Sequence, residues 1–283
     1  MKKIFLILCL FITTTFSNNN ELTIIIEKDV LDDYKKFIEN KNPLKLTDFK
    51  DKYSRRSTIE LVLLQQALEK GGYKKPSLKF ILTPSYTRKI VQLKSGLGFS
   101  SGTSMWIYDL EKSKDFLYIS DPLIKNGEYE AGFYTIETNK KALNVKSLED
   151  IQKLTAISNK YWIPDWKTLE NLKLKKLINT TKWKFIVRMV SIKRGDFLLA
   201  SFQNTEDLSF FSEGIKLVPI QGLKVGLQGS RHFAISKNYP KSKELFKALN
   251  KGMKILRKEG IIKKAYEQSG FFNEKVKNWK KLN

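Results

Sequence analysis

The 283-residue chain has one cysteine and one histidine, and this scarcity excludes several kinds of site. The cysteine, Cys9, falls inside an N-terminal apolar run, so the rest of the chain has no thiol for a disulfide, a nucleophile or a metal. With His232 as the only imidazole, the usual metal cages are excluded, and a Ser-His triad would have to be built on that residue. We therefore expect no metal and no cofactor, and we expect His232 to be a structural hydrogen-bonding residue in a strand.

Long apolar runs and nucleotide-binding loops are also missing. After residue 17 no segment is apolar over enough residues to cross a membrane. No phosphate loop ending in Gly-Lys-Ser/Thr occurs. The stretch Gly96–Gly102 superficially resembles a dinucleotide loop, but its spacing is wrong and it follows an expected helix instead of a strand. Because catalytic signatures are absent, we expect a protein that is not an enzyme.

Acidic residues are scarce relative to basic ones. The chain has 52 Lys and Arg against 29 Asp and Glu, which gives a formal net charge of +23. Such an excess indicates either an evenly solvated, lysine-rich surface or an anionic partner such as a membrane, a nucleic acid or an acidic solute. The lysines are spread along the whole chain, without a dense basic run interleaved with aromatics. We therefore expect the evenly charged surface and no nucleic-acid partner.

The N-terminus has the pattern of a secretory signal peptide. Lys2 and Lys3 precede the apolar run Ile4–Ile12, and small polar residues lead to an expected cleavage site after Ser17. A buried N-terminal strand or helix is the alternative. The signal pattern predicts an exported, periplasmic protein whose mature chain relies on its core and has no disulfide.

Strand and helix patterns alternate through the rest of the chain in two rounds. The first round has patterns at residues 22–27, 58–72, 77–83, 86–93, 105–108 and 130–138. The second has patterns at residues 147–154, 155–158, 165–172, 178–180, 183–193, 197–202, 208–213 (a helix) and 215–219 (a strand). Two such rounds imply two α/β lobes. The strand run 223–237 and the amphipathic pattern from Leu245 to Tyr266 have no core of their own, so they must return to the first lobe.

No low-complexity linker separates the two lobes, so the chain crosses between them in extended segments. We expect these crossings near residues 134–139 and 225–235. The expected organisation is a signal peptide at 1–17, a discontinuous first lobe at 18–136 and 234–283, and a second lobe at 137–233.

Several aromatic side chains lie near expected strand ends, where ligands bind in open α/β sheets: Trp106, Tyr161, Trp162 and Trp166. Tryptophan offers a rigid face for an apolar or ring-bearing solute, although each tryptophan is as well explained as core. Arginine offers a planar fork for carboxylate or phosphate, with surface or interlobe ion pairs as the alternative. The expected ligand-binding residues are Ser104, Trp106, Ser158, Trp162, Asp165, Arg194 and Ser201, with Arg88 and Arg231 as weaker candidates.

The order and spacing of several segments resemble the type II periplasmic solute-binding proteins, in particular the family whose best-known members bind amino acids. The matching segments are the signal peptide and residues 60–68, 88–96, 119–122, 147–151, 189–197 and 234–260. They cover nearly all of the mature chain. The resemblance implies two lobes joined by two crossing strands, a ligand in the cleft between them and hinge closure on binding. It also implies delivery of the solute to an ABC transporter or a membrane receptor.

Two positions depart from that resemblance. Ser113, seven residues before Ser120, stands where amino-acid binders carry the arginine that clamps the ligand carboxylate. Ser201, five residues after Asp196, stands where they carry an aspartate for the ligand ammonium. An unpaired buried carboxylate or ammonium is costly, so we expect a solute other than an ordinary α-amino acid.

The sequence thus predicts a monomeric, exported binding protein for a small anionic or aromatic solute; the anionic character is inferred from the arginines alone. Two other classes remain open. One is a dehydratase-like enzyme of the same fold, with Asp165 or Glu128 as the acid in the cleft. The other is a sensory or scaffold module that binds no solute and has tightly packed tryptophans filling its cleft.

Overall fold

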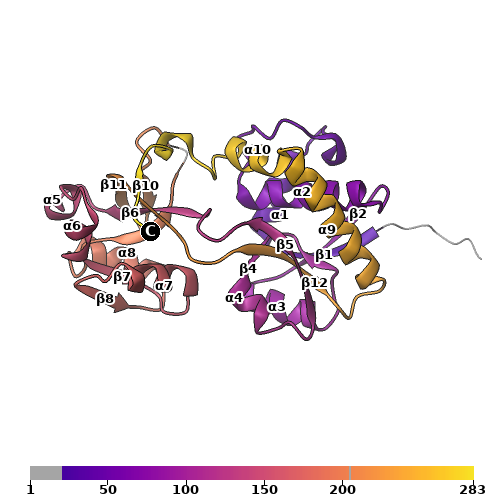
Figure 1. Ribbon diagram of the computed structural model, residues 1–283, viewed down its shortest axis with the longest axis horizontal. Coiled ribbons are helices and arrows are strands. Elements are labelled where there is room, and N and C mark those ends of the chain that lie inside the picture. Colours follow the sequence, from indigo (N-terminus) through magenta and orange to yellow (C-terminus); the bar gives the residue numbers. More distant parts are fainter. Residues whose placement is uncertain (1–20, 204) are drawn as a thin grey trace, which may run out of the picture.

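The computed structural model describes residues 21–203 and 205–283, which form two α/β lobes side by side along the long axis of the molecule (Figure 1). The expected signal peptide at 1–17 and Cys9 lie outside the described residues. Within them, no helix combines the length and the apolar character that a membrane span requires.

The first lobe is built on a six-stranded sheet in which β1, β2 and β3 are parallel. β12 is antiparallel to β3, β4 and β5 and lies at the centre of the sheet. The strands are β1 (Glu21–Ile26), β2 (Ser77–Leu82), β3 (Ser100–Ser101), β4 (Met105–Trp106), β5 (Leu117–Ile124) and β12 (Arg231–Ser236). The late strand β12 therefore completes a sheet that begins with the first described residues, as the sequence predicts.

Helices cover this sheet, and the closest helix pair joins the early and late parts of the chain. The helical elements are α1 (Lys28–Phe37), η1 (Pro43–Lys45), α2 (Arg56–Gly71), α3 (Tyr86–Lys94), α4 (Ile107–Glu111), α9 (Ser242–Lys258) and α10 (Ile261–Gln268). A Cβ atom on Gly252 of α9 would lie 1.7 Å from the Ala67 carbonyl oxygen of α2, so only glycine permits this approach. The apolar face of α9, with Leu245, Leu249 and Met253, is thereby buried.

The second lobe has a mixed sheet in the order β10-β11-β6-β9, which a bridge between Ala156 and Phe197 joins to the parallel pair β7-β8. The strands are β6 (Glu130–Thr135), β7 (Thr155–Ser158), β8 (Lys176–Asn179), β9 (Leu198–Ser201), β10 (Phe210–Ser212) and β11 (Ile215–Gly226). The helices are α5 (Lys140–Leu143), α6 (Leu148–Gln152), α7 (Ile163–Asn171) and α8 (Trp183–Ser191). Residues 210–212 form a strand, so the helix expected at 208–213 is wrong.

The sheet pairing places the two crossings at residues 125–129 and 227–230 (Figure 1). β6 pairs with β9 and β11, so residues 130–135 belong to the second lobe, not to the first as expected from a boundary at 136. β12 pairs within the first sheet, so residues 231–233 belong to the first lobe, not to the second. Sequence periodicity identifies these strands but does not reveal which sheet each one joins.

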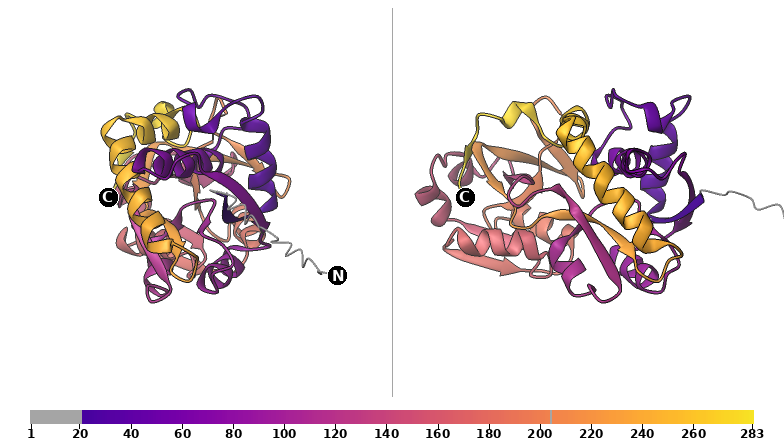
Figure 2. Two further views of the ribbon diagram at one scale, coloured as in Figure 1. Left: turned by 90° about the vertical axis from the view of Figure 1, so that its right-hand side faces the viewer. Right: turned by 45° about the vertical axis from the view of Figure 1, so that its right-hand side comes forward.

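A third segment also passes between the lobes. After α10, residues 273–283 leave the first lobe, into which the expected boundaries placed them, and pack on the second (Figures 1 and 2). β13 (Lys280–Lys281) pairs with β11, and η2 (Glu274–Val276) buries Val276 in the second-lobe core. Trp279 packs edge-on against Phe202, with ring centroids 5.3 Å apart. We call residues 273–283 the C-terminal strap.

Candidate functional site

A cavity of about 310 Å³ lies at the junction of the lobes, against both crossing segments. Trp106 of β4 is its wall from the first lobe, and Tyr129 and Leu227 come from the two crossings. The second lobe supplies the remaining wall. The aromatic, charged and polar residues among the lining are Trp106, Tyr129, Trp162, Trp183, Phe210, Asp165, Ser201 and Gln203.

Trp162 and Asp165 reach the cavity because a short, braced loop joins β7 to α7. Asn159 Oδ1 accepts from the Tyr161 amide at 2.9 Å, and Asn159 Nδ2 donates to Thr181 O at 3.0 Å. α7 opens with Ile163-Pro164, and proline suits the first helical turn because its missing N–H is not needed there. The loop and helix start thus place Trp162 at the helix cap and Asp165 in the first turn.

Three second-lobe rings form one aromatic wall. Trp162 and Trp183 lie 6.2 Å apart between ring centroids, and Trp183 stacks on Phe210 at 6.4 Å with an interplanar angle of 18°. Trp183 Nε1 donates to Ser212 Oγ at 2.7 Å, which satisfies the indole N–H and fixes the ring. The wall presents rigid aromatic surface to the cavity.

The opposite wall consists of Trp106 and Tyr129, with ring centroids 5.2 Å apart. The Tyr129 hydroxyl and Ser201 Oγ hydrogen bond at 2.8 Å, which ties the first crossing segment to β9. The guanidinium carbon of Arg231 lies 4.7 Å from the Trp106 ring centroid, so this tryptophan is held by a cation–π contact.

Asp165 is the only charged side chain among the described residues that line the cavity. It is half-buried, and it forms no ion pair with any described residue. Burial raises the pKa of the Asp165 carboxyl to about 6, because the charged form loses water without gaining a cation. The cavity therefore has an acidic group without a cationic partner among the described residues, on the same lining as the aromatic wall.

A buried ion cluster lies next to Trp106 in the first lobe. The Glu60 carboxylate is fully buried; it pairs with Arg56 at 3.0 Å and accepts from Ser104 Oγ at 2.7 Å and Tyr266 Oη at 3.0 Å. Arg231 Nε donates to Ser104 Oγ at 3.0 Å. Burial alone would raise the pKa of Glu60, but Arg56 and Arg231 outweigh it and hold the pKa below its usual range. We call Arg56, Glu60, Ser104, Arg231 and Tyr266 the buried ion cluster.

The structure brings four of the nine expected ligand-binding residues together on the cavity wall: Trp106, Trp162, Asp165 and Ser201. Ser104 and Arg231 belong to the buried ion cluster and do not line the cavity. Ser158 is buried at the end of β7, where its carbonyl accepts from the Thr180 amide. Arg88 and Arg194 are exposed, on α3 and on the loop after α8, and neither lines the cavity. Charge alone does not show where an arginine points.

Sequence reasoning missed Tyr129, Trp183, Gln203 and Phe210. Trp183 had an available signal, because it follows the expected strand at 178–180 and ligand sites gather at such strand ends. Tyr129 belongs to a crossing that was expected elsewhere, and Phe210 to a strand that was expected as a helix. Glu128, the other acid considered for the cleft, accepts from the Lys125 amide at 2.7 Å and does not line the cavity.

His232 has the structural role that its strand position predicts. Nδ1 donates to Ser120 O at 2.7 Å and Nε2 accepts from Ser230 Oγ at 2.7 Å, so both ring nitrogens are used. Burial lowers the pKa of His232, which keeps the ring neutral. Among residues 21–203 and 205–283, no group of three His, Cys, Asp or Glu residues is placed to hold a metal ion.

A second cavity of about 510 Å³ adjoins the first and shares Tyr129, Ser201 and Gln203 with it. Arg55 and Arg56 line this second cavity, and both already form ion pairs with acidic side chains. Arg55 binds Asp33 at 2.8 Å and Asp29 at 2.9 Å, and Arg56 binds Glu60. These arginines are therefore less available to an anionic solute than their number suggests.

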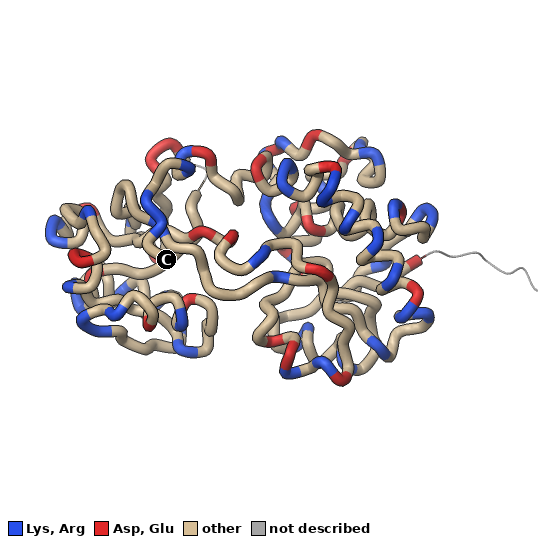
Figure 3. The backbone as a smooth tube through the Cα atoms, in the orientation of Figure 1, with Lys and Arg blue, Asp and Glu red and all other residues tan. Residues whose placement is uncertain are grey.

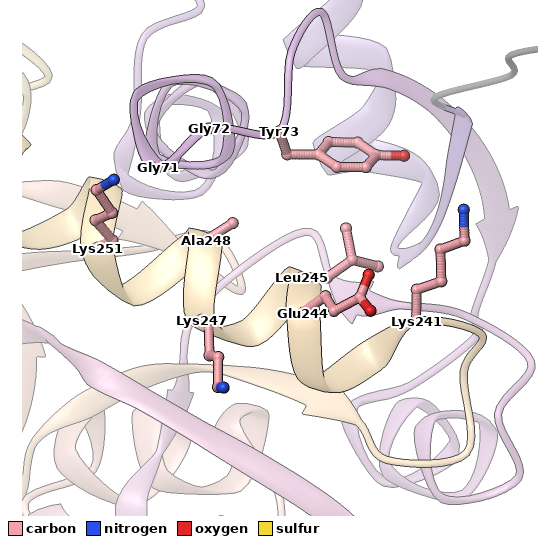
Figure 4. A pocket seen from close by; sticks show the side chains of 9 residues that line it. All are labelled: Gly71, Gly72, Tyr73, Lys241, Glu244, Leu245, Lys247, Ala248 and Lys251. Atoms are coloured by element: carbon pink, nitrogen blue, oxygen red, sulfur yellow. The ribbon is translucent and has the colours of Figure 1, made fainter.

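A groove of about 400 Å³ lies on the outside of the first lobe, between the end of α2 and the first half of α9 (Figure 4). Its floor is apolar, with Leu245 and Ala248, and lysines stand at its edge (Figure 4). It involves one lobe only and has no link to the crossing segments.

Lys and Arg positions are spread over both lobes, with acidic residues among them (Figure 3). This distribution agrees with the evenly charged surface that the sequence predicts.

Comparisons with known proteins identify the fold. No protein-family model matches the chain, and no curated protein matches it in sequence. The periplasmic VFT2 domain of BvgS from Bordetella pertussis is similar, with 14% identity and a TM-score of 0.56 over 88% of this chain and 94% of that one. Substrate-binding domain 2 of GlnP from Lactococcus lactis, in its open conformation, has 17% identity and a TM-score of 0.53 over 89% and 96%.

An ancestral protein is similar too. AncCDT-1, described as an amino acid-binding protein and a precursor of cyclohexadienyl dehydratase, has 20% identity and a TM-score of 0.50 over 88% of this chain and 95% of that one. At these identities the likeness establishes the fold alone. The chain has the two-lobed type II periplasmic solute-binding fold.

Proposed function

We propose that this protein binds a small solute in the cavity between its lobes and closes about the hinge when the solute enters. The observation that carries this proposal is a cavity against both crossing segments with walls from both lobes. A solute there contacts Trp106 of the first lobe and the aromatic wall of the second, so binding favours the closed arrangement. The expected ligand-binding roles of Trp106, Trp162, Asp165 and Ser201 form part of this proposal.

The lining favours a solute with apolar or ring-bearing surface. Five aromatic side chains line the cavity, which supports the expected aromatic character of the solute. The expected anionic character was inferred from the arginines, and none of Arg88, Arg194 and Arg231 lines this cavity.

An ordinary α-amino acid fits this lining poorly. Ser113, at the position of the expected carboxylate clamp, is buried outside the cavity. Ser201 lines the cavity, but its hydroxyl bonds Tyr129 and has no charge for an ammonium. These two positions support a solute other than an ordinary α-amino acid.

The expected cellular role is part of the same proposal. We infer that the protein is exported to the periplasm and acts as a monomer that hands its solute to an ABC transporter or a membrane receptor. The N-terminal pattern of charge and apolar residues and the fold of BvgS VFT2 and GlnP domain 2 support this role.

Small-angle X-ray scattering tests the binding function directly when combined with calorimetry. The wild-type protein, titrated with extracts of small molecules from its host, is expected to release heat and to decrease in radius of gyration. Trp106→Ala, which removes the first-lobe wall, is expected to bind more weakly and to lose most of the compaction. A protein that neither releases heat nor compacts would refute the proposal and favour the sensory or scaffold role.

A dehydratase-like activity is the second candidate, because a cleft carboxyl with a pKa of about 6 suits a general acid near neutral pH. Asp165 would give its proton to the departing hydroxyl of a cyclohexadienyl acid as the C–O bond breaks and water leaves, while the ring carboxylate is lost as CO2 and the electron pair of its C–C bond makes the ring aromatic. Product formation from such an acid by the wild type and not by Asp165→Asn would establish this activity. Binding without turnover would leave the solute-binding role.

A further inference from the structure

We propose that the solute taken by this cavity is an organic cation, an amine or a quaternary ammonium, whose charge is held by the Asp165 carboxylate and the ring faces of Trp162 and Trp183. This inference rests on the proposed function, because it specifies the solute of the same cavity.

The carboxylate is the first argument. Asp165 lines the cavity, is half-buried and has no cationic partner among the described residues. A carboxylate withdrawn from water is unfavourable unless a cation or several hydrogen bonds compensate it. Solute binding removes the remaining water from Asp165. A cationic solute supplies the missing partner at that moment, whereas a neutral solute leaves the carboxylate more poorly solvated than before.

The aromatic wall is the second argument. Trp162 and Trp183 stand side by side with centroids 6.2 Å apart, and both line the cavity that contains Asp165. The face of an indole ring carries negative charge density and attracts cations more strongly than other aromatic rings do. An ammonium between the two indoles and the carboxylate is therefore stabilised by three groups. A ring-bearing neutral solute would use the same indoles but would gain nothing from Asp165.

The third argument is that the neighbouring arginines, Arg231 and Arg56, already have partners. Arg231 is held in the buried ion cluster by Ser104 and stacks on Trp106, and Arg56 is paired with Glu60. Neither lines the cavity. On the described lining of this cavity an anionic solute would meet the Asp165 carboxylate and no cation, and like charges repel in a partly desolvated cleft. Because Arg231 already occupies Trp106, we place the solute cation toward Trp162 and Trp183.

The test uses calorimetry with two sets of probes that keep their shape and change their charge. Choline, dimethylbutanol and dimethylbutanoate share a branched end group, and phenethylamine, phenethyl alcohol and phenylacetate share a ring. In each set the first probe is cationic, the second uncharged and the third anionic. At least one cation is expected to bind the full-length protein about tenfold or more tightly than its uncharged counterpart.

Two variants test whether Asp165 is the group that binds the positive charge of the probe. Asp165→Asn is expected to weaken binding of that cation by about 10- to 100-fold and to leave the uncharged probe within about twofold. Glu170→Gln removes one acidic charge from the exposed side of the same helix and is the control, with affinities expected to remain at wild-type values. Asn has nearly the shape of Asp and removes an unfavourably desolvated charge, so Asp165→Asn is expected to fold. Thermal melting checks that both variants are folded.

The outcomes separate this inference from the proposed function. If an uncharged or anionic probe binds most tightly, the inference of a cationic solute is wrong and the solute-binding role remains. The same holds if Asp165→Asn and Glu170→Gln lose equal affinity for the cationic probe. No binding of any probe, together with no heat from host extracts, overturns both.

Discussion

The guanidinium carbon of Arg231 lies 4.7 Å from the ring centroid of Trp106. This contact connects two parts of the molecule, because Arg231 belongs to the buried ion cluster of the first lobe and Trp106 lines the interlobe cavity. Arg231 thus acts on the cavity through the tryptophan that it supports. The arrangement explains why an arginine expected to bind solute has no place on the cavity wall.

Arg231→Met is expected to destabilise the first lobe and to weaken solute binding. It removes the support beneath Trp106, the hydrogen bond to Ser104 Oγ and one of the two cations that hold down the pKa of the fully buried Glu60, while the Arg56–Glu60 pair remains. Leaving buried polar groups without these partners costs about 1–3 kcal/mol. Thermal or urea unfolding measures the loss. Arg194→Met, at an exposed site, is the matched control and is expected to change stability by less than about 0.5 kcal/mol. Equal stabilities of the two variants would refute the structural role of the cluster.

Trp183→Leu is expected to weaken solute binding by about 5- to 30-fold, because it removes the central ring of the second-lobe aromatic wall. Trp166→Leu is the control. Trp166 lies on α7 and donates to Glu170, and it does not line the cavity. Calorimetry with the solute that binds the wild type makes the comparison. If Trp166→Leu weakened binding as much as Trp183→Leu did, the wall would not be the binding surface.

Solute affinity is expected to depend on pH through Asp165. The carboxyl has a pKa of about 6 without solute, and a cationic solute favours its charged form. Affinity is therefore highest above pH 6 and falls as the pH decreases through 6, by up to about tenfold for each pH unit. Titrations from pH 5 to pH 8 should show this decline in the wild type and not in Asp165→Asn. A flat wild-type profile would exclude Asp165 as the charge partner.

Stability without solute should show the opposite trend. Because burial raises the folded-state pKa of Asp165 above its value of 3.8 in the unfolded chain, its protonated form favours the folded state. The contribution is fully present below pH 3.8 and is lost as the pH rises through about 6. The difference in melting temperature between Asp165→Asn and the wild type should therefore grow from pH 5 to pH 7. A constant difference would show that the carboxyl is not desolvated.

Deletion of residues 274–283 is expected to destabilise the second lobe more than the first. It removes Val276 and Trp279 from the second-lobe core and leaves β11 without β13. Trp279 is half-buried, so its loss costs less than the about 3–5 kcal/mol of a fully buried tryptophan, and loss of the buried Val276 adds to it. Hydrogen exchange should accelerate in β11 and β9 while α2 keeps its protection. Unchanged protection in β11 would show that the C-terminal strap is not needed for the lobe to fold.

The sequence predicts the fold well wherever a long apolar pattern exists. The apolar stripe of α9, from Leu245 to Leu256, requires a partner, and its return to α2 and the first sheet follows from that requirement. Short elements carry less information. Residues 210–212 are expected to be helical from the sequence but form a strand. Phe210 pairs with Leu217 of β11, and its ring stacks on Trp183, so tertiary contacts decide the conformation of this segment. The two-residue β13 has no pattern at all.

The site could be predicted only in part, and for a physical reason. Trp162 and Asp165 line the cavity because they follow a strand at the start of a helix, a local arrangement that the sequence shows. Arg88 and Arg194 were expected in the cleft for their chemistry, although nothing local directs them there. Tyr129 reaches the cavity only because the crossing is at 125–129, which depends on sheet pairing across both lobes.

Native mass spectrometry of proteins purified in parallel from the host tests the central claim most directly. The wild type and Glu170→Gln are expected to retain the same small-molecule adduct, and Asp165→Asn is expected to lose it. Fragmentation of the released adduct should identify an amine or a quaternary ammonium. An adduct retained equally by Asp165→Asn, or the absence of any adduct from the wild type, would contradict a solute held at Asp165 between the two lobes.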